Sequence, residues 1–218
     1  MSSARDVLVM GGTGYIGQAL VAELLRRGHR VRVVARAASL ARVPAGAEAV
    51  TGDVLDAASL AQALRAGDTV VHLVGTPHPN PAKAQAFIDV DLTATRAMAQ
   101  AAARVGVAHV VYVSVAHPAP VMQDYISARV LGEQAIAARK LTTTILRPWY
   151  VLGPGRRWPV VFKPLYALAR VVPAWRDAAE RLGLVTLDQM VRALANAVDA
   201  PPPPGKVYII DVEEIRAA

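Results

Sequence analysis

The sequence predicts an α/β fold built on a doubly wound parallel sheet. Short apolar runs alternate with segments of helical periodicity, the pattern of strand–helix–strand units with right-handed crossovers. A glycine-rich turn joins the first apolar run to the first helical segment. With 218 residues, 54% of them hydrophobic, the chain can bury a large core and is the right length for one such domain. We therefore expect a single domain over residues 1–218.

The first strand and the first helix flank the motif around which the chain is organised. Residues 6–10 predict a strand and residues 14–27 a helix with an apolar stripe. Gly11, Gly14 and Gly17 between them follow a G-x-x-G-x-x-G spacing. We expect the first to permit a sharp turn, the second to let backbone approach a pyrophosphate, and the third to let the helix pack close to the strand. The helix N-terminus would add N–H groups and a positive dipole end. This predicts a Rossmann-type dinucleotide site, and the alternative is a purely structural turn.

The end of the second strand favours one cofactor over the other. Residues 31–35 predict this strand, and Arg36 follows directly. About twenty residues past the glycine loop, NAD-binding Rossmann domains carry an acid that holds the adenosine ribose. Here the position holds arginine, and the next acid is Glu48. A guanidinium can pair with a 2′-phosphate, so the sequence favours NADP, with NAD as the alternative. The other interpretation of Arg36 is a solvated charge at a strand end.

Asp53 follows the third predicted strand, residues 47–51. Its carboxylate has two interpretations: it accepts a hydrogen bond from the adenine amino group, or it caps the turn into the helix predicted over 57–64.

The fourth strand, residues 69–74, is an unbroken apolar run except for His72, as expected for a strand buried on both faces. His72 is therefore expected to be a core histidine with a hydrogen-bond partner. Gly75 follows, where a side chain would crowd a bound dinucleotide.

The second half of the chain continues the alternation. The predicted elements are helix 83–104, strand 107–114, strand 142–146, helix 186–198 and strand 207–210. The prolines at 201–204 predict a stiff extended connector.

Three polar side chains are candidates for catalysis. Ser114 ends the fifth strand at its C-terminal edge, where ligands bind in open parallel sheets. Asp124 is expected to cap a helix in which Tyr125 and Arg129 lie one turn apart on the same face. Pro148 is expected to end the sixth strand.

The segment 158–176 is apolar with interspersed Arg and Lys and two prolines. It is interpreted as core, as the lining of a substrate pocket, or as a segment lying on a membrane surface near a lipid or quinone substrate. We expect a small substrate lobe drawn mainly from residues 153–184.

Composition argues against several classes of function. The chain has no cysteine, and no two of its 5 histidines share a helical turn, so we expect no metal site. MSSARD lacks the apolar run of a signal peptide, and no run is long enough for a membrane span, so a cytoplasmic location is expected. The net charge of +7 has three interpretations: a preference for anionic ligands, contact with an anionic membrane surface, or a compositional bias of the genome. The chain lacks the clustered basic face with interleaved aromatics that predicts nucleic-acid binding.

Motifs along nearly the whole chain resemble the short-chain dehydrogenase/reductase superfamily, in its extended, epimerase/dehydratase-like and atypical branches. They are GGTGYIG at 11–17, GDV at 52–54, VVHLVG at 70–75, VVYVSV at 110–115, YISAR at 125–129, ILRPWYVLGPG at 145–155 and VTLDQMVRAL at 185–194. The resemblance implies a Rossmann fold, bound NAD or NADP, and oxidoreductase, epimerase or dehydratase chemistry. Together with the motif analysis it gives these cofactor-binding candidates: Gly11, Thr13, Gly14, Tyr15, Ile16, Gly17, Arg36, Asp53, Val54, Leu73, Val74, Gly75, Ser114, Tyr125, Arg129 and Pro148.

The candidate catalytic residues depart from the family's pattern in two places. Active members use Tyr-x-x-x-Lys, in which the Tyr phenolate moves the substrate hydroxyl proton and the Lys holds the nicotinamide ribose. Tyr125 matches, but Arg129 stands at the Lys position, a substitution that is not conservative. The carbonyl-polarising Ser or Thr usually lies a couple of residues beyond Ser114, where Val115 and Ala116 cannot donate. Ser114 is expected either to replace it or to contact only the cofactor.

Two functions follow from this comparison. The first is an NADP-preferring oxidoreductase or epimerase that uses Tyr125, Arg129 and Ser114 on an unknown small-molecule substrate. The second is a cofactor-binding sensor, assembly factor or structural protein with little catalysis. With these two departures the chain resembles the atypical branch of the superfamily, which includes the accessory subunit of respiratory complex I and the NmrA-like regulators.

Overall fold

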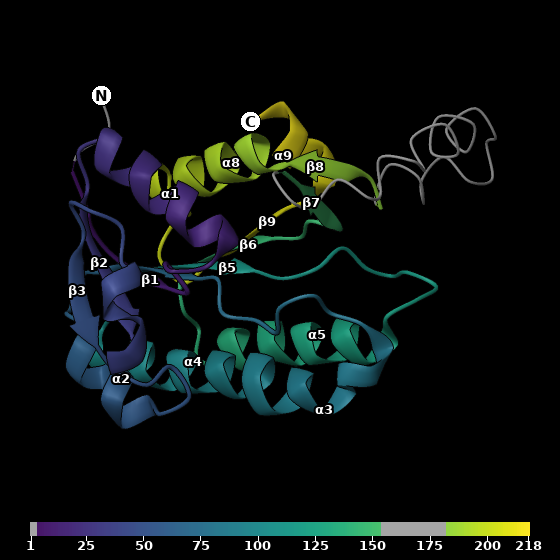
Figure 1. Cartoon of the computed structure of the whole chain (residues 1–218), viewed down its shortest axis with the longest axis horizontal. Helices are drawn as coiled ribbons and strands as arrows, with labels where there is room; N and C mark the ends of the chain where they lie inside the picture. The colour runs from purple at the N-terminus through teal and green to yellow at the C-terminus, as the bar shows by residue number, and fades with distance from the viewer. Residues whose placement is uncertain (1–3, 154–181) are drawn as a thin grey trace.

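In the computed structural model, which describes residues 4–153 and 182–218, a parallel sheet of 7 strands forms the centre of the molecule (Figure 1). Its strands are β1 (Asp6–Met10), β2 (Arg30–Ala35), β3 (Glu48–Thr51), β4 (Thr69–His72), β5 (His109–Val113), β6 (Thr143–Leu146) and β9 (Val207–Ile210). The α-helices are α1 (Tyr15–Arg26), α2 (Ala57–Ala63), α3 (Ala84–Ala86), α4 (Thr93–Val105), α5 (Gln123–Ala137), α8 (Leu187–Asp199) and α9 (Val212–Ala217).

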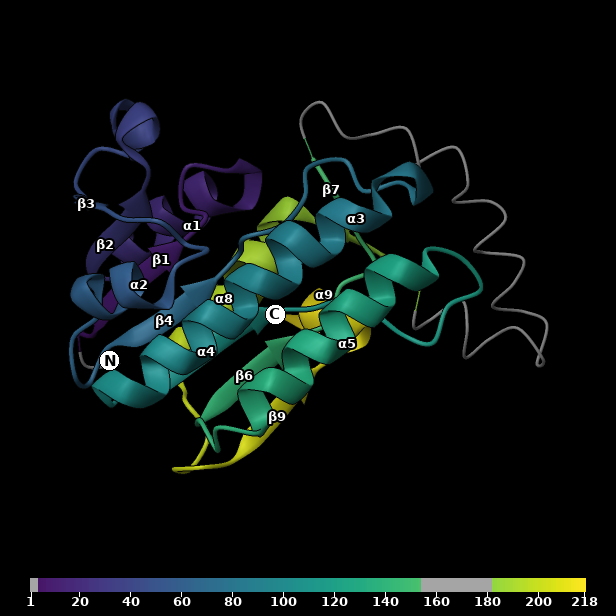
Figure 2. The same ribbon diagram turned by 90° about the horizontal axis from the view of Figure 1, so that it is seen from below.

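Helices cover both faces of the sheet. In Figure 1, α1 and α8 lie on one face and α2, α4 and α5 on the other, and Figure 2 shows α4 and α5 side by side across that second face. Alternate residues of each central strand point to opposite faces. Along β1, Val7 and Val9 belong to one buried apolar cluster, while Leu8 and Met10 belong to the other. This confirms the predicted doubly wound sheet.

The order of the strands places the candidate residues at one edge. The order is β3-β2-β1-β4-β5-β6-β9, so the chain runs outward from β1 to β3 and then returns to β4 on the other side of β1. Ligands of open parallel sheets bind outside the carboxyl ends of the strands at such a reversal. The glycine loop follows β1 and Gly75 comes soon after β4, so both lie at this point.

The predicted helix 83–104 is not one regular helix. It consists of a 3₁₀ turn (Pro81–Lys83), α3, a π-helical turn (Phe87–Leu92) and α4. Within the π-helical turn, Asp91 is buried, and its carbonyl oxygen accepts a hydrogen bond from Thr95 Oγ1 at 2.8 Å. Apolar periodicity predicts helix here but does not distinguish α from π geometry, because both place apolar residues on one face at a similar spacing.

Two further predictions were wrong in detail. Asp124 does not cap α5; the N-cap is Met122, in a left-handed conformation with φ 61°, and Asp124 lies in the first turn, where its charge favours the helix dipole. The proline segment 201–204 is not extended throughout, because the Lys206 N–H donates to the Pro203 carbonyl at 3.0 Å and closes a turn.

The sequence also gave no sign of a second, 2-stranded parallel sheet, β7 (Tyr150–Leu152) with β8 (Leu184–Thr186), or of α9. Strands of this length carry too little alternation to be recognised.

His72 is a core histidine, as predicted. It is fully buried on β4, and its Nε2 lies 2.9 Å from Thr95 Oγ1. Burial, with a smaller contribution from the Arg129 charge, lowers the pKa of His72 to about 3. The imidazole is therefore neutral in the folded protein at ordinary pH.

Acid should destabilise the fold partly through His72. The unfolded chain binds a proton on this ring below about pH 6.5, whereas the folded protein does so only near pH 3. The stability contributed by the neutral ring is complete above pH 6.5 and is lost as pH falls toward 3. We expect the free energy of unfolding, obtained from thermal unfolding at a series of pH values, to depend more steeply on pH in the wild type than in His72→Leu. The two slopes should differ by up to about 1.4 kcal/mol per pH unit in this window and should be equal above pH 7. Equal slopes at pH 4–6 would contradict this role.

Candidate functional site

The glycine loop has room for backbone only. Gly11 has φ +86°, and a Cβ built on it would lie 3.0 Å from the Leu73 carbonyl carbon. A Cβ on Gly17 would lie 2.2 Å from the Gly11 oxygen, so this glycine is needed for the close packing of α1 on the loop. Gly14 is the N-cap of α1, and the helix has no acidic residue in its first turn. The loop therefore ends at a helix N-terminus whose dipole and N–H groups suit an anion.

Gly14 is less crowded than its two neighbours in the motif. A Cβ there would meet only the Gly11 oxygen, at 3.2 Å. The protein itself thus tolerates little at Gly11 and Gly17, whereas the reason for glycine at Gly14 remains the predicted approach of a pyrophosphate.

Two arginines lie in the segment that follows β2. Arg36 is exposed and comes directly after β2, at the start of a 3₁₀ helix (Ala37–Arg42). At the end of that helix, Arg42 Nη2 donates to the Thr13 carbonyl oxygen at 3.2 Å. Sequence reasoning missed Arg42, and its signal would have been a second cation within two helical turns of Arg36. Arg36 thus stands at the end of the second strand, where the ribose of a dinucleotide is expected.

Asp53 shapes the turn before α2. Its Oδ1 accepts a hydrogen bond from the Leu55 N–H at 2.9 Å, and the side chain is exposed. The cap of α2 is Asp56, whose carboxylate accepts from the N–H groups of Ala58 and Ser59. Asp53 is thus a turn residue, not the helix cap, and its contact with adenine, like that of Val54, stays a prediction.

Residues after β4, β5 and β6 continue the same edge. The Leu73 N–H donates to the Met10 carbonyl at 2.9 Å, which ties the chain after β4 to the end of β1. The Ala116 N–H donates to the Pro148 carbonyl at 3.0 Å, which ties the segments after β5 and β6. Of the remaining candidates, Tyr15 and Ile16 begin α1, and Val74 and Gly75 follow Leu73.

Tyr125 and Arg129 lie together on α5. The Arg129 guanidinium carbon is 5.2 Å from the centroid of the Tyr125 ring, close enough for a cation–π interaction. Arg129 Nη1 donates to the Val113 carbonyl oxygen at 3.0 Å, at the end of β5. Burial lowers the pKa of Arg129, but Tyr125, Tyr112 and Asp91 outweigh it, so the net shift is upward and the residue is a permanent cation. The predicted pair of Tyr125 and Arg129 therefore lies next to the carboxyl end of β5.

Asp91 completes this arrangement, and sequence reasoning missed it. Its Oδ1 accepts from Arg129 Nη2 at 2.7 Å, and both side chains are buried. Local sequence carries no signal for the contact, because Asp91 and Arg129 are 38 residues apart.

Ser114 is held by a carboxylate. Its Oγ donates to Glu133 Oε1, and Arg147 donates to both oxygens of Glu133, through Nε at 3.0 Å and through Nη2. The hydroxyl proton of Ser114 is thus already donated within the protein. Val115 and Ala116 are buried apolar residues and offer no donor.

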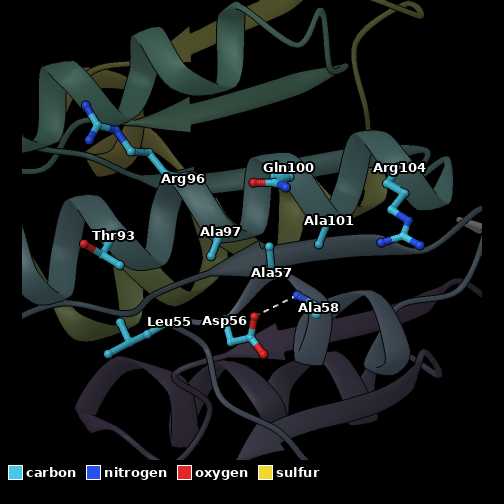
Figure 3. A pocket seen from close by; sticks show the side chains of 10 residues that line it. All are labelled: Leu55, Asp56, Ala57, Ala58, Thr93, Arg96, Ala97, Gln100, Ala101 and Arg104. Atoms are coloured by element: carbon cyan, nitrogen blue, oxygen red, sulfur yellow. Dashed lines mark hydrogen bonds between the residues drawn. The ribbon is translucent and has the colours of Figure 1, made fainter.

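A groove of about 580 Å³ lies elsewhere, between α2 and α4 (Figure 3). Figure 3 shows Arg96, Gln100 and Arg104 along its α4 side and alanines on its floor. It contains none of the sequence-predicted site residues.

Three expectations concern absences or lie beyond the described residues. In residues 4–153 and 182–218 no helix has the length and apolar character to cross a bilayer, and no cluster of His, Asp or Glu could hold a metal ion. The segment 158–176, and with it most of the predicted lobe over 153–184, falls outside the described residues.

Comparison with known proteins gives a family match over most of the chain. The family model described as "NAD dependent epimerase/dehydratase family" matches residues 7–210. The chain is 26% identical over 219 residues to ceramide reductase of Caulobacter vibrioides, covering 97% of this chain and 66% of that protein. It is 46% identical over 66 residues to a 3 beta-hydroxysteroid dehydrogenase/Delta 5→4-isomerase of Mycobacterium tuberculosis, covering 30% and 18%. The chain thus spans less than two thirds of these relatives.

Solved structures share the fold. A dTDP-glucose 4,6-dehydratase from Streptomyces venezuelae, with NAD bound, matches with a TM-score of 0.69 and 24% identity, covering 94% of this chain and 75% of that one. A UDP-N-acetylglucosamine 4-epimerase from Bacillus cereus matches with a TM-score of 0.68 and 18% identity, covering 95% and 79%.

Proposed function

This chain belongs to the NAD dependent epimerase/dehydratase family, and we propose that it is an NADP-preferring oxidoreductase or epimerase whose acid–base residue is Tyr125. The observation that carries the proposal is the position of Tyr125 over the Arg129 cation, which is itself bound to the end of β5. The glycine loop after β1 and Gly75 after β4 belong to this same edge of the sheet, which supports placing the proposed acid–base residue beside the proposed cofactor cradle.

A dinucleotide fits the residues of the loop. Gly11 and Gly17 are packed so closely against backbone that side chains are excluded, and the loop ends at the N-terminus of α1. Thr13, Tyr15 and Ile16 would contact the pyrophosphate from this loop and helix turn. Leu73, Val74 and Gly75 would border the dinucleotide on the β4 side, and Pro148 on the β6 side.

The chemistry follows from the phenol and the cation. A bound nicotinamide would supply hydride transfer. Tyr125 would take the proton from a substrate hydroxyl, or return it to a carbonyl oxygen, and the Arg129 charge would stabilise the phenolate. Because Ser114 donates to Glu133, and Val115 has no hydroxyl, orientation of the carbonyl is weak and turnover should be slow. An alcohol, or the ketone or aldehyde derived from it, is the substrate class that this chemistry requires.

The preference for NADP rests on Arg36. It is exposed at the carboxyl end of β2, and no acid lies between it and Glu48. Arg42 places a second guanidinium beside the loop. Two cations without a neighbouring carboxylate favour a 2′-phosphate over a free 2′-hydroxyl.

Calorimetric titration of NADP(H) and NAD(H) tests the proposal. We expect Arg36→Ala to weaken NADPH binding by about ten- to a hundred-fold, the loss of one charge-assisted contact, and to leave NADH binding unchanged. Arg139→Ala, which removes another exposed cation, after α5, is the matched control. Equal wild-type affinities for the two cofactors would refute the NADP preference. Tight binding without turnover on any alcohol or ketone would favour a cofactor-binding protein without catalysis.

A further inference from the structure

The Arg129 guanidinium is fixed on two sides within the protein. Nη2 donates to Asp91 Oδ1 at 2.7 Å, and Nη1 donates to the Val113 carbonyl at 3.0 Å. The side chains of Arg129 and Asp91 are 5% and 0% exposed. Each charge of a pair this deeply buried depends on the other, because removing one partner leaves the second uncompensated away from water.

Asp91 is fixed as firmly as its partner. Its Oδ2 accepts from the Thr76 N–H at 2.8 Å and from Thr76 Oγ1 at 2.7 Å. One carboxylate therefore connects the chain after β4 to α5. It lies in the π-helical turn, and such irregular turns within helices occur frequently at functional sites.

Because Gly75 has no side chain, the Arg129–Asp91 pair can occupy the space beside it. A Cβ on Gly75 would lie 2.2 Å from Arg129 Nη2 and 3.2 Å from Asp91 Oδ1. In this protein the absence of a side chain at Gly75 is thus required by the guanidinium itself. Gly75, Asp91 and Arg129 fit together as one unit.

We propose that Asp91 is a positioning residue that holds Arg129 against the sheet beside Tyr125 and offsets part of its charge, so that Arg129 and Asp91 act as one ion-paired unit with the cation next to the phenol. The inference rests on the proposed function only in giving Tyr125 the acid–base role. A lysine alone at position 129 would not reproduce the unit, because one ammonium cannot match the planar geometry with which Arg129 reaches both Asp91 and Val113. Arg129→Lys is therefore expected to give no gain in turnover.

The test compares Asp91→Asn, Arg129→Gln and the double variant. Each single variant leaves a buried charge unpaired, and we expect its Tm to fall by about 6–20 °C. The double variant has no unpaired buried charge, so its fall in Tm should be well below the sum of the falls in the two single variants. Asp89→Asn is the matched control, since Asp89 lies in the same π-helical turn but is exposed. The Asp89→Asn substitution should leave Tm almost unchanged.

The second readout distinguishes positioning from a merely structural role. The ionisation of Tyr125 is measured without cofactor or substrate, as the phenolate absorbance that disappears in Tyr125→Phe. The charge facing this phenol is Arg129 on α5, and the counter-charge of Arg129 is Asp91 in the π-helical turn. The phenol of Tyr112 on β5 is a second titratable group that interacts with Tyr125. In Asp91→Asn the cation loses its counter-charge, so the midpoint should move about one unit or more to lower pH. In the double variant the cation is gone, and the midpoint should move to higher pH.

These outcomes are independent of whether the protein binds a dinucleotide. If the wild type bound none, the proposed function would fail while the coupling between Asp91 and Arg129 could still be measured. If Asp91→Asn did not fold, the double variant would carry the test through its opposite shift. A fall in Tm with an unmoved midpoint in every variant, or additive losses in the double variant, would overturn the inference.

Discussion

Tyr125→Phe is expected to lower turnover by about 10²–10⁴-fold while leaving cofactor affinity nearly unchanged. The change removes only the hydroxyl that would exchange a proton with the substrate, and a general acid–base group contributes a factor of this size. The phenyl ring would keep its edge contact with Phe87, at a centroid distance of 5.1 Å, and its position over Arg129. The measurement is NADPH oxidation with a panel of ketones and aldehydes, alongside calorimetric titration of NADPH.

The control for this prediction is Tyr208→Phe. Tyr208 lies on the edge strand β9, is 54% exposed, and donates its hydroxyl to Glu214. The Tyr208→Phe variant should retain wild-type turnover. Activity that survives Tyr125→Phe would reject Tyr125 as the acid–base residue, whereas loss of NADPH binding together with turnover would point to a cofactor contact instead.

The strands and the glycine loop could be predicted because their signals are local. Each central strand is a short apolar run that ends at a glycine, proline or polar residue. A strand buried on both faces can therefore be predicted from its own residues, without knowledge of the strands it pairs with. Gly17 likewise fulfils its expected role through contacts within a few residues, and the positive φ of Gly11 is a property of that residue's own backbone. The one-turn spacing of Tyr125 and Arg129 also fixes their shared face of α5.

The surroundings of Arg129 could not be predicted, because they depend on distant parts of the chain. Comparison with the Tyr-x-x-x-Lys pattern makes Arg129 a departure, but its counter-ion Asp91 comes from the π-helical turn, and its backbone acceptor Val113 from β5. Ser114 is similar, since its partner Glu133 lies on α5 and is itself bound by Arg147 from the end of β6. The sequence therefore predicts which residues gather at the sheet edge, but not which of their hydrogen bonds are already used.

Asp68→Asn is expected to cause a large loss of stability. Asp68 accepts two hydrogen bonds from Arg32 Nη2, at 2.7 and 2.6 Å, and one from the Arg65 N–H at 2.7 Å. The Arg32 and Asp68 side chains are only 5% and 1% exposed. Arg32 Nη1 also donates to the Ala63 carbonyl at 2.6 Å, so the cation cannot leave without releasing the end of α2. Removing the carboxylate should cost about 3–5 kcal/mol, or about 6–20 °C in Tm.

A second ion pair that also involves β2 supplies the control. Asp6 on β1 and Arg30 on β2 form contacts as short as those of Asp68 and Arg32, yet their side chains are 41% and 69% exposed. Water solvates both charges when one partner is removed, so Asp6→Asn should change Tm very little. Denaturant unfolding of the two variants measures the difference directly. Equal losses would mean that bond geometry, and not burial, determines the contribution of these pairs, and the large effect expected for the buried Asp91–Arg129 pair would then lose its basis as well.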